Sequence, residues 1–162
     1  MSEVGNGIDG MIKMLRLRLA TKEDCDLLFE WANDTECRRN SFSQEKIEYD
    51  IHVKWFHNRL QDTTSDLFIA IEDRKEVGMF RLDYNQNQAV ISYSVATKER
   101  RKGYGKNILQ LAEQYVREYR KDIQILVGEV KKENLVSMHR FEELGYEKKE
   151  YEECVEYTKE LV

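Results

Sequence analysis

Hydrophobic and polar residues recur along the chain with two different periods, which predicts a mixture of strands and helices. Leu15, Leu17 and Leu19 alternate with Arg16 and Arg18, the period of two that a half-buried strand requires. Further alternating or continuous apolar runs follow this segment. Strands are expected at 14–19, 66–72, 76–84, 88–96 and 123–130, with strand-forming residues again at 146–151 and 155–157. Only short polar connections separate the second, third and fourth strands, which favours an antiparallel meander.

Helical spacing of apolar residues fills the intervals between these strands. The first helix should open at Thr21, where Asp24 stands three residues on as in a capping box, and end at Asn33-Asp34. A second is expected from after Ser43 to about Leu60. The last two are expected over about 104–120 and over 134–144, the latter ending at a C′ glycine, Gly145.

The resulting order is β-α-α-β-β-β-α-β-α-β-β, so the sequence predicts an α+β fold. We see one domain, over residues 14–162, with neither an internal repeat nor a low-complexity stretch. Residues 1–13 are polar and hold three of the eight glycines, which predicts a disordered tail.

Charge and cysteine content narrow the class of partners. The net charge of −5 disfavours nucleic acid and anionic membranes as partners, and the chain lacks the run of about 18 apolar residues that a membrane span needs. Its N-terminus has no apolar core of the signal-peptide type, so a cytoplasmic location is expected. The three cysteines, Cys25, Cys37 and Cys154, have no C-x-x-C spacing, which argues against a disulfide framework or a zinc site.

The segment Arg100-Arg101-Lys102-Gly103-Tyr104-Gly105-Lys106 carries the clearest chemistry. It lies between an expected strand and the longest expected helix, and five basic residues and one acid fall within 98–106. Glycines at alternate positions let backbone N–H groups approach a ligand, and a helix N-terminus favours an anion there. A solvated turn is the alternative. The segment is neither a dinucleotide fingerprint, because Ile108 stands where the third glycine belongs, nor a Walker loop.

With its context, this loop resembles the acyl-CoA loop of the GNAT superfamily of N-acetyltransferases. Arg100-x-x-Gly103-x-Gly105 follows a strand, and Asn134-x-x-Ser137 leads to Phe141 and Leu144-Gly145-Tyr146 at the spacing that the superfamily shows. The resemblance extends over nearly the whole chain from Leu15 to Tyr157.

This resemblance implies a fold, a cofactor and a reaction. The fold would be a mixed, mostly antiparallel sheet of six to seven strands, flanked by about four helices and splayed between the fourth and fifth strands. Acetyl-CoA would lie in the opening and pass its acetyl group to a primary amine of a small molecule. The residues implied to bind acetyl-CoA are Ser94, Val95, Arg100, Arg101, Lys102, Gly103, Tyr104, Gly105, Lys106, Asn134 and Phe141.

A second pattern concerns the acceptor amine. Trp31-x-Asn33-Asp34-x3-Arg38-x2-Ser41-Phe42, followed by His52-x2-Trp55, resembles the branch that acetylates nucleotide-linked amino sugars, although Thr35 stands where that branch usually has proline. Substrate contacts are expected from Arg38, Phe42, His52 and Trp55. Arginine suits a diphosphate, but each of these residues also has a structural alternative as a cap or core residue. Two alternatives stay open: the acceptor is a protein N-terminus or another small amine, or the chain is a non-catalytic acyl-CoA-binding module. A homodimer is a possible assembly.

The sequence offers a candidate for the general base but lacks the usual general acid. Glu129 matches the position of a general base in some members, and His52 is the next candidate. Phe141 stands where the resemblance implies a tyrosine as the general acid, so that role would not carry over, and Ser137, Tyr146, Tyr93 or a water could substitute. A thiol has a pKa near ~8.5, so a dedicated acid is helpful and not obligatory. No His or Lys neighbours Cys154 in sequence to lower its pKa, so we favour direct transfer to the amine over an acetyl-cysteine.

Overall fold

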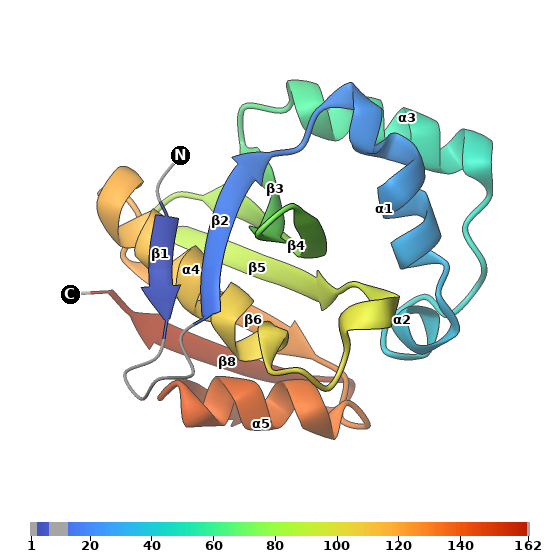
Figure 1. Ribbon diagram of the computed structural model, residues 1–162. Helices are drawn as coiled ribbons and strands as arrows, with labels where there is room; N and C mark the ends of the chain where they lie inside the picture. Colours follow the sequence, from blue (N-terminus) through green and yellow to red (C-terminus); the bar gives the residue numbers. More distant parts are fainter. Residues whose placement is uncertain (1–2, 7–12, 162) are drawn as a thin grey trace.

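Eight strands form one sheet in the order β1-β2-β3-β4-β5-β6-β8-β7, in a computed structural model that describes residues 3–6 and 13–161 (Figure 1). The strands are β1 (Glu3–Asn6), β2 (Lys13–Leu19), β3 (Ser65–Glu72), β4 (Lys75–Asn85), β5 (Gln88–Val95), β6 (Ile125–Val130), β7 (Glu147–Glu150) and β8 (Val155–Glu160). Every neighbouring pair is antiparallel except β5 and β6, which are parallel. The expected meander corresponds to β3, β4 and β5.

Helices cover both faces of this sheet. They are α1 (Cys25–Ala32), α2 (Thr35–Arg39), α3 (Tyr49–Gln61), α4 (Tyr104–Tyr119) and α5 (Leu135–Glu143), with short 3₁₀ turns at Lys22–Asp24 and Thr97–Glu99. Helices α1 and α3 pack on one face, and α4 and α5 lie on the other (Figure 1). Successive residues of β3 divide between these two faces, because Phe68 packs in the core beneath α4 while Leu67 and Ile69 pack beneath α1 and α3.

Helix α4 anchors the larger core. Its apolar residues recur at helical spacing and are fully buried: Ile108, Leu109, Leu111, Ala112 and Val116. Each large aliphatic side chain buried in this way stabilises the fold by about 1.5–3 kcal/mol. The N-terminus of α4 is therefore held firmly against the sheet.

Strands β5 and β6 pair over only a short stretch. Their register runs from Gln88↔Ile125 to Val90↔Val127 and stops there, whereas β5 continues to pair with β4 as far as Val95. The carboxyl-terminal halves of β5 and β6 therefore diverge. The predicted splay between the fourth and fifth strands is confirmed, and it leaves one backbone edge of residues 91–95 without a strand partner among the described residues.

The structure contains one strand and one helix that the sequence did not predict. Residues 3–6, expected in a disordered tail, form β1, which pairs with the edge of β2 from Glu3↔Arg16 to Asn6↔Lys13. Residues 1–2 and 7–12 of that expected tail lie outside the described residues. Strand β1 brings the sheet to eight strands, one above the upper expectation of seven.

The second difference lies between α1 and α3. The carboxylate of Asp34 accepts hydrogen bonds from the amides of Glu36 and Cys37, at 3.1 and 3.2 Å, and so starts the short helix α2. Helix α3 begins only at Tyr49, so Ile47, expected inside a helix, lies in a loop of residues 40–48. We call this segment the acceptor loop. None of the described helices combines the length and apolar character needed to span a membrane.

Candidate active site

A cavity of about 1140 Å³ opens where β5 and β6 diverge. Its lining comes from both faces of the sheet: α1, α2, the acceptor loop and α3 on one side, and the β6–α5 connection and α5 on the other. Sites for one small ligand commonly measure about 300–1,000 Å³, so this cavity has room for two ligands together. We call the part next to α5 and the loop before α4 its cofactor half, and the part next to α1, α3 and the acceptor loop its acceptor half.

The loop before α4 has the backbone that an anion site needs. Gly103 caps α4 with φ 84° and ψ 8°, in the left-handed region, and Arg101 also has a positive φ of 65°. Only glycine adopts the first conformation without strain. No described side chain caps this N-terminus, so the first N–H groups of α4 are available to a ligand.

The basic side chains of this loop are more fully paired than their spacing suggests. Arg100 Nη2 lies 2.5 Å from Asp34 Oδ2, and Arg100 Nε lies 2.9 Å from Glu36 Oε2. Lys102 pairs with Glu99 at 2.9 Å, and Lys106 pairs with a carboxylate of α5 at 3.1 Å. The expected local excess of positive charge is thus reduced by Asp34, Glu36 and Glu143, which come from other elements. Of the loop residues, Arg100 and Arg101 line the cavity.

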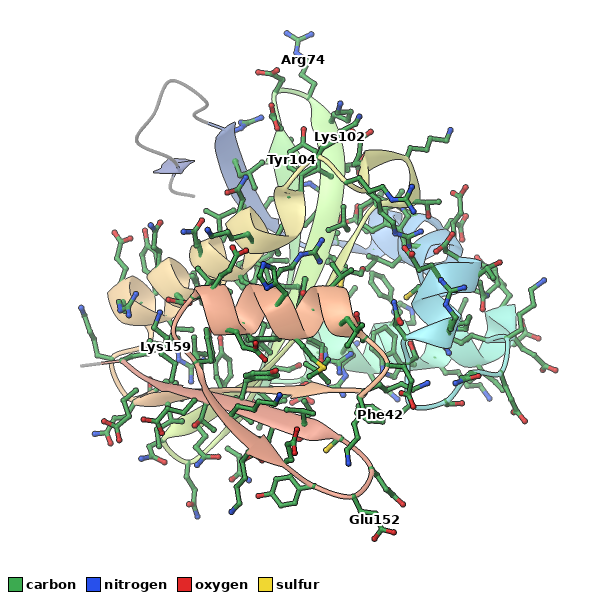
Figure 2. All side chains as sticks on the ribbon, turned by 90° about the horizontal axis from the view of Figure 1, so that it is seen from below. Phe42, Arg74, Lys102, Tyr104, Glu152 and Lys159 are labelled. Carbon is green, nitrogen blue, oxygen red and sulfur yellow. The ribbon has the colours of Figure 1, made fainter. Side chains whose placement is uncertain are left out.

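Tyr104 and Gly105, both expected to bind the cofactor, contribute in different ways. Tyr104 is 5% exposed and packs in the core, where burial and a hydrogen bond to Glu72 raise its pKa. Its side chain is therefore a packing element and only its backbone can face a ligand. A Cβ at Gly105 would lie 2.3 Å from the guanidinium carbon of Arg140, so the glycine permits that side chain to rest on the first turn of α4. Figure 2 shows Tyr104 and Lys102 at the start of α4, well apart from Phe42.

The opposite wall of the cofactor half is the unpaired edge of β5. Ser94 and Val95 line the cavity and pair with β4 on their other side. Asn134 lies across the opening, where its side-chain oxygen accepts a hydrogen bond from the Ser137 amide at 3.2 Å and so caps α5.

Phe141 supplies only apolar surface. It is 1% exposed and stacks on Tyr157 with ring centroids 5.2 Å apart. Its para carbon would lie 2.4 Å from a Cβ at Gly128, so the ring points at the β6 backbone. Tyr146, proposed above as a substitute acid, is buried and donates to Glu113 on α4 at 3.1 Å. Burial and that carboxylate raise the pKa of Tyr146 well above its ordinary value, and Tyr146 is not among the residues that line the cavity.

Glu129 lies in the cavity wall with its carboxylate exposed. Within the part of the chain that the structure describes, no hydrogen bond or ion pair engages this carboxylate. Its neighbour Gly128 faces α5, so by strand alternation Glu129 faces the acceptor half. The carboxylate is thus accessible from that side.

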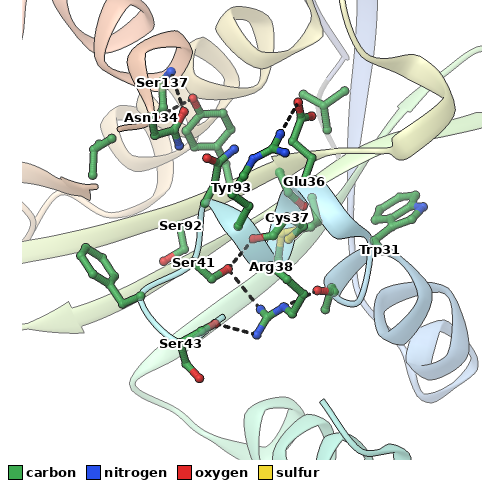
Figure 3. A pocket seen from close by; sticks show the side chains of 18 of the residues that line it. Trp31, Glu36, Cys37, Arg38, Ser41, Ser43, Ser92, Tyr93, Asn134 and Ser137 are labelled. Atoms are coloured by element: carbon green, nitrogen blue, oxygen red, sulfur yellow. Dashed lines mark hydrogen bonds and ion pairs between the residues drawn. The ribbon is translucent and has the colours of Figure 1, made fainter. Parts of the chain in front are cut away.

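Arg38 holds the acceptor loop in place, as Figure 3 shows. Its guanidinium donates to the carbonyls of Ala32 at 2.7 Å, Ser43 at 3.0 Å and Glu45 at 3.2 Å, and to the Ser41 hydroxyl at 3.1 Å. Four of its five N–H groups are thereby occupied. Only one N–H group of Arg38 is therefore left for the direct contact with a diphosphate that the sequence predicted.

His52 is also committed to the protein interior. It is 3% exposed, and its Nε2–H donates to the Cys25 carbonyl at 2.9 Å. The ring packs against three aromatic neighbours, Phe29, Trp55 and Phe56. These contacts give His52 a structural role. Because His52 also borders the cavity, its expected role as a base or substrate ligand stays a prediction.

Phe42 and Trp55 do reach the cavity. Phe42 is 58% exposed on the acceptor loop. Two guanidiniums lie near the Trp55 ring, those of Arg59 and Arg81, at 5.7 and 5.6 Å from its centroid. Both guanidiniums pair with Asp83, at 2.6 and 2.8 Å, which fixes this cation–aromatic stack beside the acceptor half.

Comparison with known proteins settles the family. The sequence model of the acetyltransferase (GNAT) domain matches residues 14–147, which is most of the chain. The chain belongs to the GNAT acetyltransferase family. It is an acyl-CoA-dependent N-acetyltransferase, with acetyl-CoA as its cofactor. No match was found among curated protein sequences.

Solved structures share the fold of this GNAT domain at low identity. Spermidine N-acetyltransferase from Vibrio cholerae, in complex with CoA and spermine, is 16% identical over 91% of this chain and 95% of its own, with a TM-score of 0.82. A domain from Methanocaldococcus jannaschii is 18% identical over 92% and 99%, with a TM-score of 0.79. RimL, a ribosomal L7/L12 α-N-protein acetyltransferase in complex with CoA, is 15% identical over 91% and 94%, with a TM-score of 0.76.

The geometry fits an acyl-CoA. The bare N-terminus of α4 behind Gly103 would hold the pyrophosphate, and the unpaired edge of β5 at Ser94 and Val95 would hold the pantetheine arm by main-chain hydrogen bonds. When bound, acetyl-CoA supplies the thioester carbonyl that the amine attacks.

Some residues of the GNAT site are apparent only in the structure. Arg140, Arg81 and Cys37 line the cavity but belong to none of the sequence patterns. Burial raises the pKa of the Cys37 thiol, so this cysteine is no ready nucleophile. Arg140 stands three residues after Ser137 on the expected helix, so helical periodicity offered a signal for it.

Proposed function

We propose that this GNAT enzyme N-acetylates a primary amine on a nucleotide-linked sugar. The observation that carries the proposal is the aromatic wall of the acceptor half, where exposed Phe42 and the Trp55–Arg81 stack flank a cavity with room for two ligands. Aromatic faces and guanidiniums suit the planar and anionic parts of a nucleotide. The sequence pattern around Trp31, Arg38 and His52 supports the same acceptor, with Arg38 shaping the site through the acceptor loop.

Glu129 takes the proton of the attacking amine in this proposal. Its exposed carboxylate faces the acceptor half and has no competing partner among the described residues. Proton removal of this kind contributes about 10²–10⁴-fold to a rate. Most of the remaining acceleration comes from holding the amine and the thioester together, which the two walls of the cavity do.

A second acceptor class is favoured by a specific feature of the lining. Four carboxylates without a described ion pair line the cavity, at Glu45, Glu48, Glu129 and Glu133. A polyamine or another small cationic amine would match them. The spermidine enzyme and RimL share the fold, so a polyamine and a protein N-terminus are the two alternatives to test.

The deciding experiment is calorimetry with CoA present. We expect UDP alone and a UDP-linked amino sugar to bind, and spermidine to bind weakly or not at all. Release of free thiol from acetyl-CoA then identifies the acceptor that turns over. Binding and acetylation of spermidine without any binding of UDP would overturn the amino-sugar proposal and favour the cationic amine.

Location and assembly are also proposed. The three cysteines have no disulfide partner, which fits a reducing cytoplasm. We propose a homodimer as the assembly to test by analytical ultracentrifugation. One structure of the V. cholerae enzyme is described as dodecameric, so the ultracentrifugation data should also be fitted with larger assemblies.

A further inference from the structure

Tyr93 crosses the opening between β5 and α5. It lies in the part of β5 that has separated from β6, and its phenol oxygen lies 2.8 Å from the hydroxyl oxygen of Ser137 on α5 (Figure 3). Arg140, one turn further along α5, donates to the same phenol oxygen at 3.3 Å. Among the described residues that line the cavity, Tyr93 is the one tyrosine.

The phenol is held rigidly on the cofactor side. Ser137 is 6% exposed and sits in the first turn of α5, which Asn134 caps. The ring of Tyr93 packs edge-on against Phe141, with centroids 6.1 Å apart. Two hydrogen bonds and one ring contact therefore fix where the hydroxyl lies.

Strand alternation separates Tyr93 from Glu129. Tyr93 belongs to the core beneath α4 and α5, whereas Glu129 follows Gly128, whose Cβ direction faces α5, and so points to the opposite face. A proton donor and a proton acceptor thus stand on the two sides of the diverging strands. This separation would suit a base on the side where an amine enters and an acid on the side where the CoA sulfur leaves.

Arg140 connects the phenol with the start of α4. Its guanidinium rests against Gly105 in the first turn of α4 and also reaches the Tyr93 oxygen. A guanidinium that donates to this oxygen while resting on the first turn of α4 helps to hold the phenol in one place. Arg140 is therefore placed to orient the hydroxyl of Tyr93.

We propose that Tyr93 is the catalytic acid of this enzyme, oriented by Ser137 and by Arg140 as a positioning residue. The amine nitrogen bonds to the thioester carbon, the carbon–sulfur bond breaks, and Tyr93 donates its proton to the departing sulfur. Glu129 accepts the proton that the amine loses, and solvent returns a proton to the phenolate. The proposal rests on acetyl transfer from acetyl-CoA and does not depend on which amine is the acceptor.

The first test measures binding alone. Calorimetry compares CoA with desulfo-CoA, which has hydrogen in place of the thiol, for the wild type and for Tyr93→Phe. We expect the wild type to prefer CoA by about 3- to 10-fold, the range of one hydrogen bond, and Tyr93→Phe to lose that preference. Tyr119→Phe, at an exposed ring on α4, is the matched control and should keep it.

The second test measures turnover. Hydroxylamine is a small acceptor that is already neutral near neutral pH, so its acetylation does not depend on how a larger acceptor is bound. We expect Tyr93→Phe to lower kcat by about 100-fold, while Glu156→Gln, outside the cavity wall, changes it little. Arg140→Met should lower kcat less and change the pH profile of kcat, and Arg140→Lys should restore part of the rate.

The outcomes separate this proposal from the proposed function. A Tyr93→Phe enzyme with unchanged kcat and an unchanged preference for CoA overturns Tyr93 as the acid, even if acetylation itself is confirmed. A wild type that binds CoA but acetylates no amine overturns the proposed function, and the comparison with desulfo-CoA still tests Tyr93. Adding Phe141→Tyr to Tyr93→Phe should not rescue turnover, because that hydroxyl would point at Gly128; a full rescue would place the acid at position 141.

Discussion

The two halves of the cavity are built by different means. The cofactor half relies on backbone groups of regular elements: the unpaired edge of β5, which lines the cavity, and the first turn of α4 behind Gly103, which follows the lining residues Arg100 and Arg101. The acceptor half uses a loop that side chains hold to its neighbours. Asn33 accepts from the Ile47 amide at 2.7 Å and donates to the Ile47 carbonyl at 2.8 Å, and Arg38 binds two further carbonyls of the acceptor loop.

This difference shows how one fold can keep its cofactor and change its acceptor. Backbone donors at a helix N-terminus depend on the helix and the glycine, and so tolerate change in most side chains. A loop held by two or three polar side chains can be rebuilt by replacing those side chains alone. We therefore expect substitutions in the two halves to affect different constants.

The largest effect should come from Gly103→Val in the cofactor half. A branched side chain disfavours the φ of 84° at Gly103 and crowds the backbone that would meet a pyrophosphate. We expect acetyl-CoA affinity measured by calorimetry to fall at least about 100-fold, or ~2.8 kcal/mol.

Gly145→Val is the matched control for this substitution. Gly145 has nearly the same φ, 85°, and a Cβ there would have nothing within 4 Å. This variant should lose a similar amount of stability and keep its acetyl-CoA affinity. Equal losses of affinity in both variants would mean that backbone strain, and not the loop, explains the result.

Glu129→Gln should have the next largest effect, at the boundary between the two halves. The substitution keeps the size of the side chain and removes its capacity to accept a proton. With the natural acceptor we expect kcat to fall about 10²-fold, with acetyl-CoA affinity unchanged and part of the rate restored at high pH, where more of the amine is neutral.

The control for Glu129 is its cross-strand neighbour. Glu156 stands opposite Glu129 in the β6–β8 register and is not part of the cavity wall. Glu156→Gln should leave kcat near the wild-type value. A normal kcat for Glu129→Gln across the pH range would show that another group is the base.

Arg38→Ala should have a smaller effect, confined to the acceptor half. Removing the guanidinium frees the carbonyls of Ser43 and Glu45 and loosens the acceptor loop. We expect KM for the amine to rise about 10-fold while acetyl-CoA affinity stays the same, because uniform binding of the acceptor is what is lost. Arg74→Ala, at an exposed arginine outside the cavity wall, is the control, and an equal loss of acetyl-CoA affinity for Arg38→Ala would contradict the separation of the two halves.

The smallest effect concerns the contact that joins the halves, Arg100 with Asp34. Burial alone would raise the pKa of the Asp34 carboxyl, but hydrogen bonds from Arg100 and from the Cys37 amide outweigh it and hold this pKa below its ordinary value. A carboxyl with a lowered pKa adds stability above its unfolded pKa of about 3.9, and that stability is lost as the pH falls through its folded value.

Urea unfolding at several pH values tests this contact. The wild type should be more stable than Asp34→Asn near neutral pH, and the difference between their midpoints should shrink as the pH drops below about 4. A difference that stays constant with pH would mean that the cap of α2, and not the charge on Asp34, stabilises this region.

The sequence by itself determined the parts of the molecule that local chemistry controls. The strands of the meander, helix α4 and the glycine at φ 84° follow from periodicity and from a conformation that other residues avoid. The resemblance to the family followed from the spacing within the loop Arg100-x-x-Gly103-x-Gly105 and from Asn134 further along the chain. Gly103 is needed for the backbone conformation of this loop.

Only the tertiary structure decided the roles of the polar side chains. Arg38 and His52 fit a binding pattern in sequence, yet one holds a loop and the other is buried against Cys25, since their partners come from segments that no local rule links to them. Tyr93 and Arg140 meet at one oxygen although 47 positions separate them. Such contacts depend on where β5 and β6 diverge and where α5 packs, and neither can be predicted from the spacing of residues along the sequence.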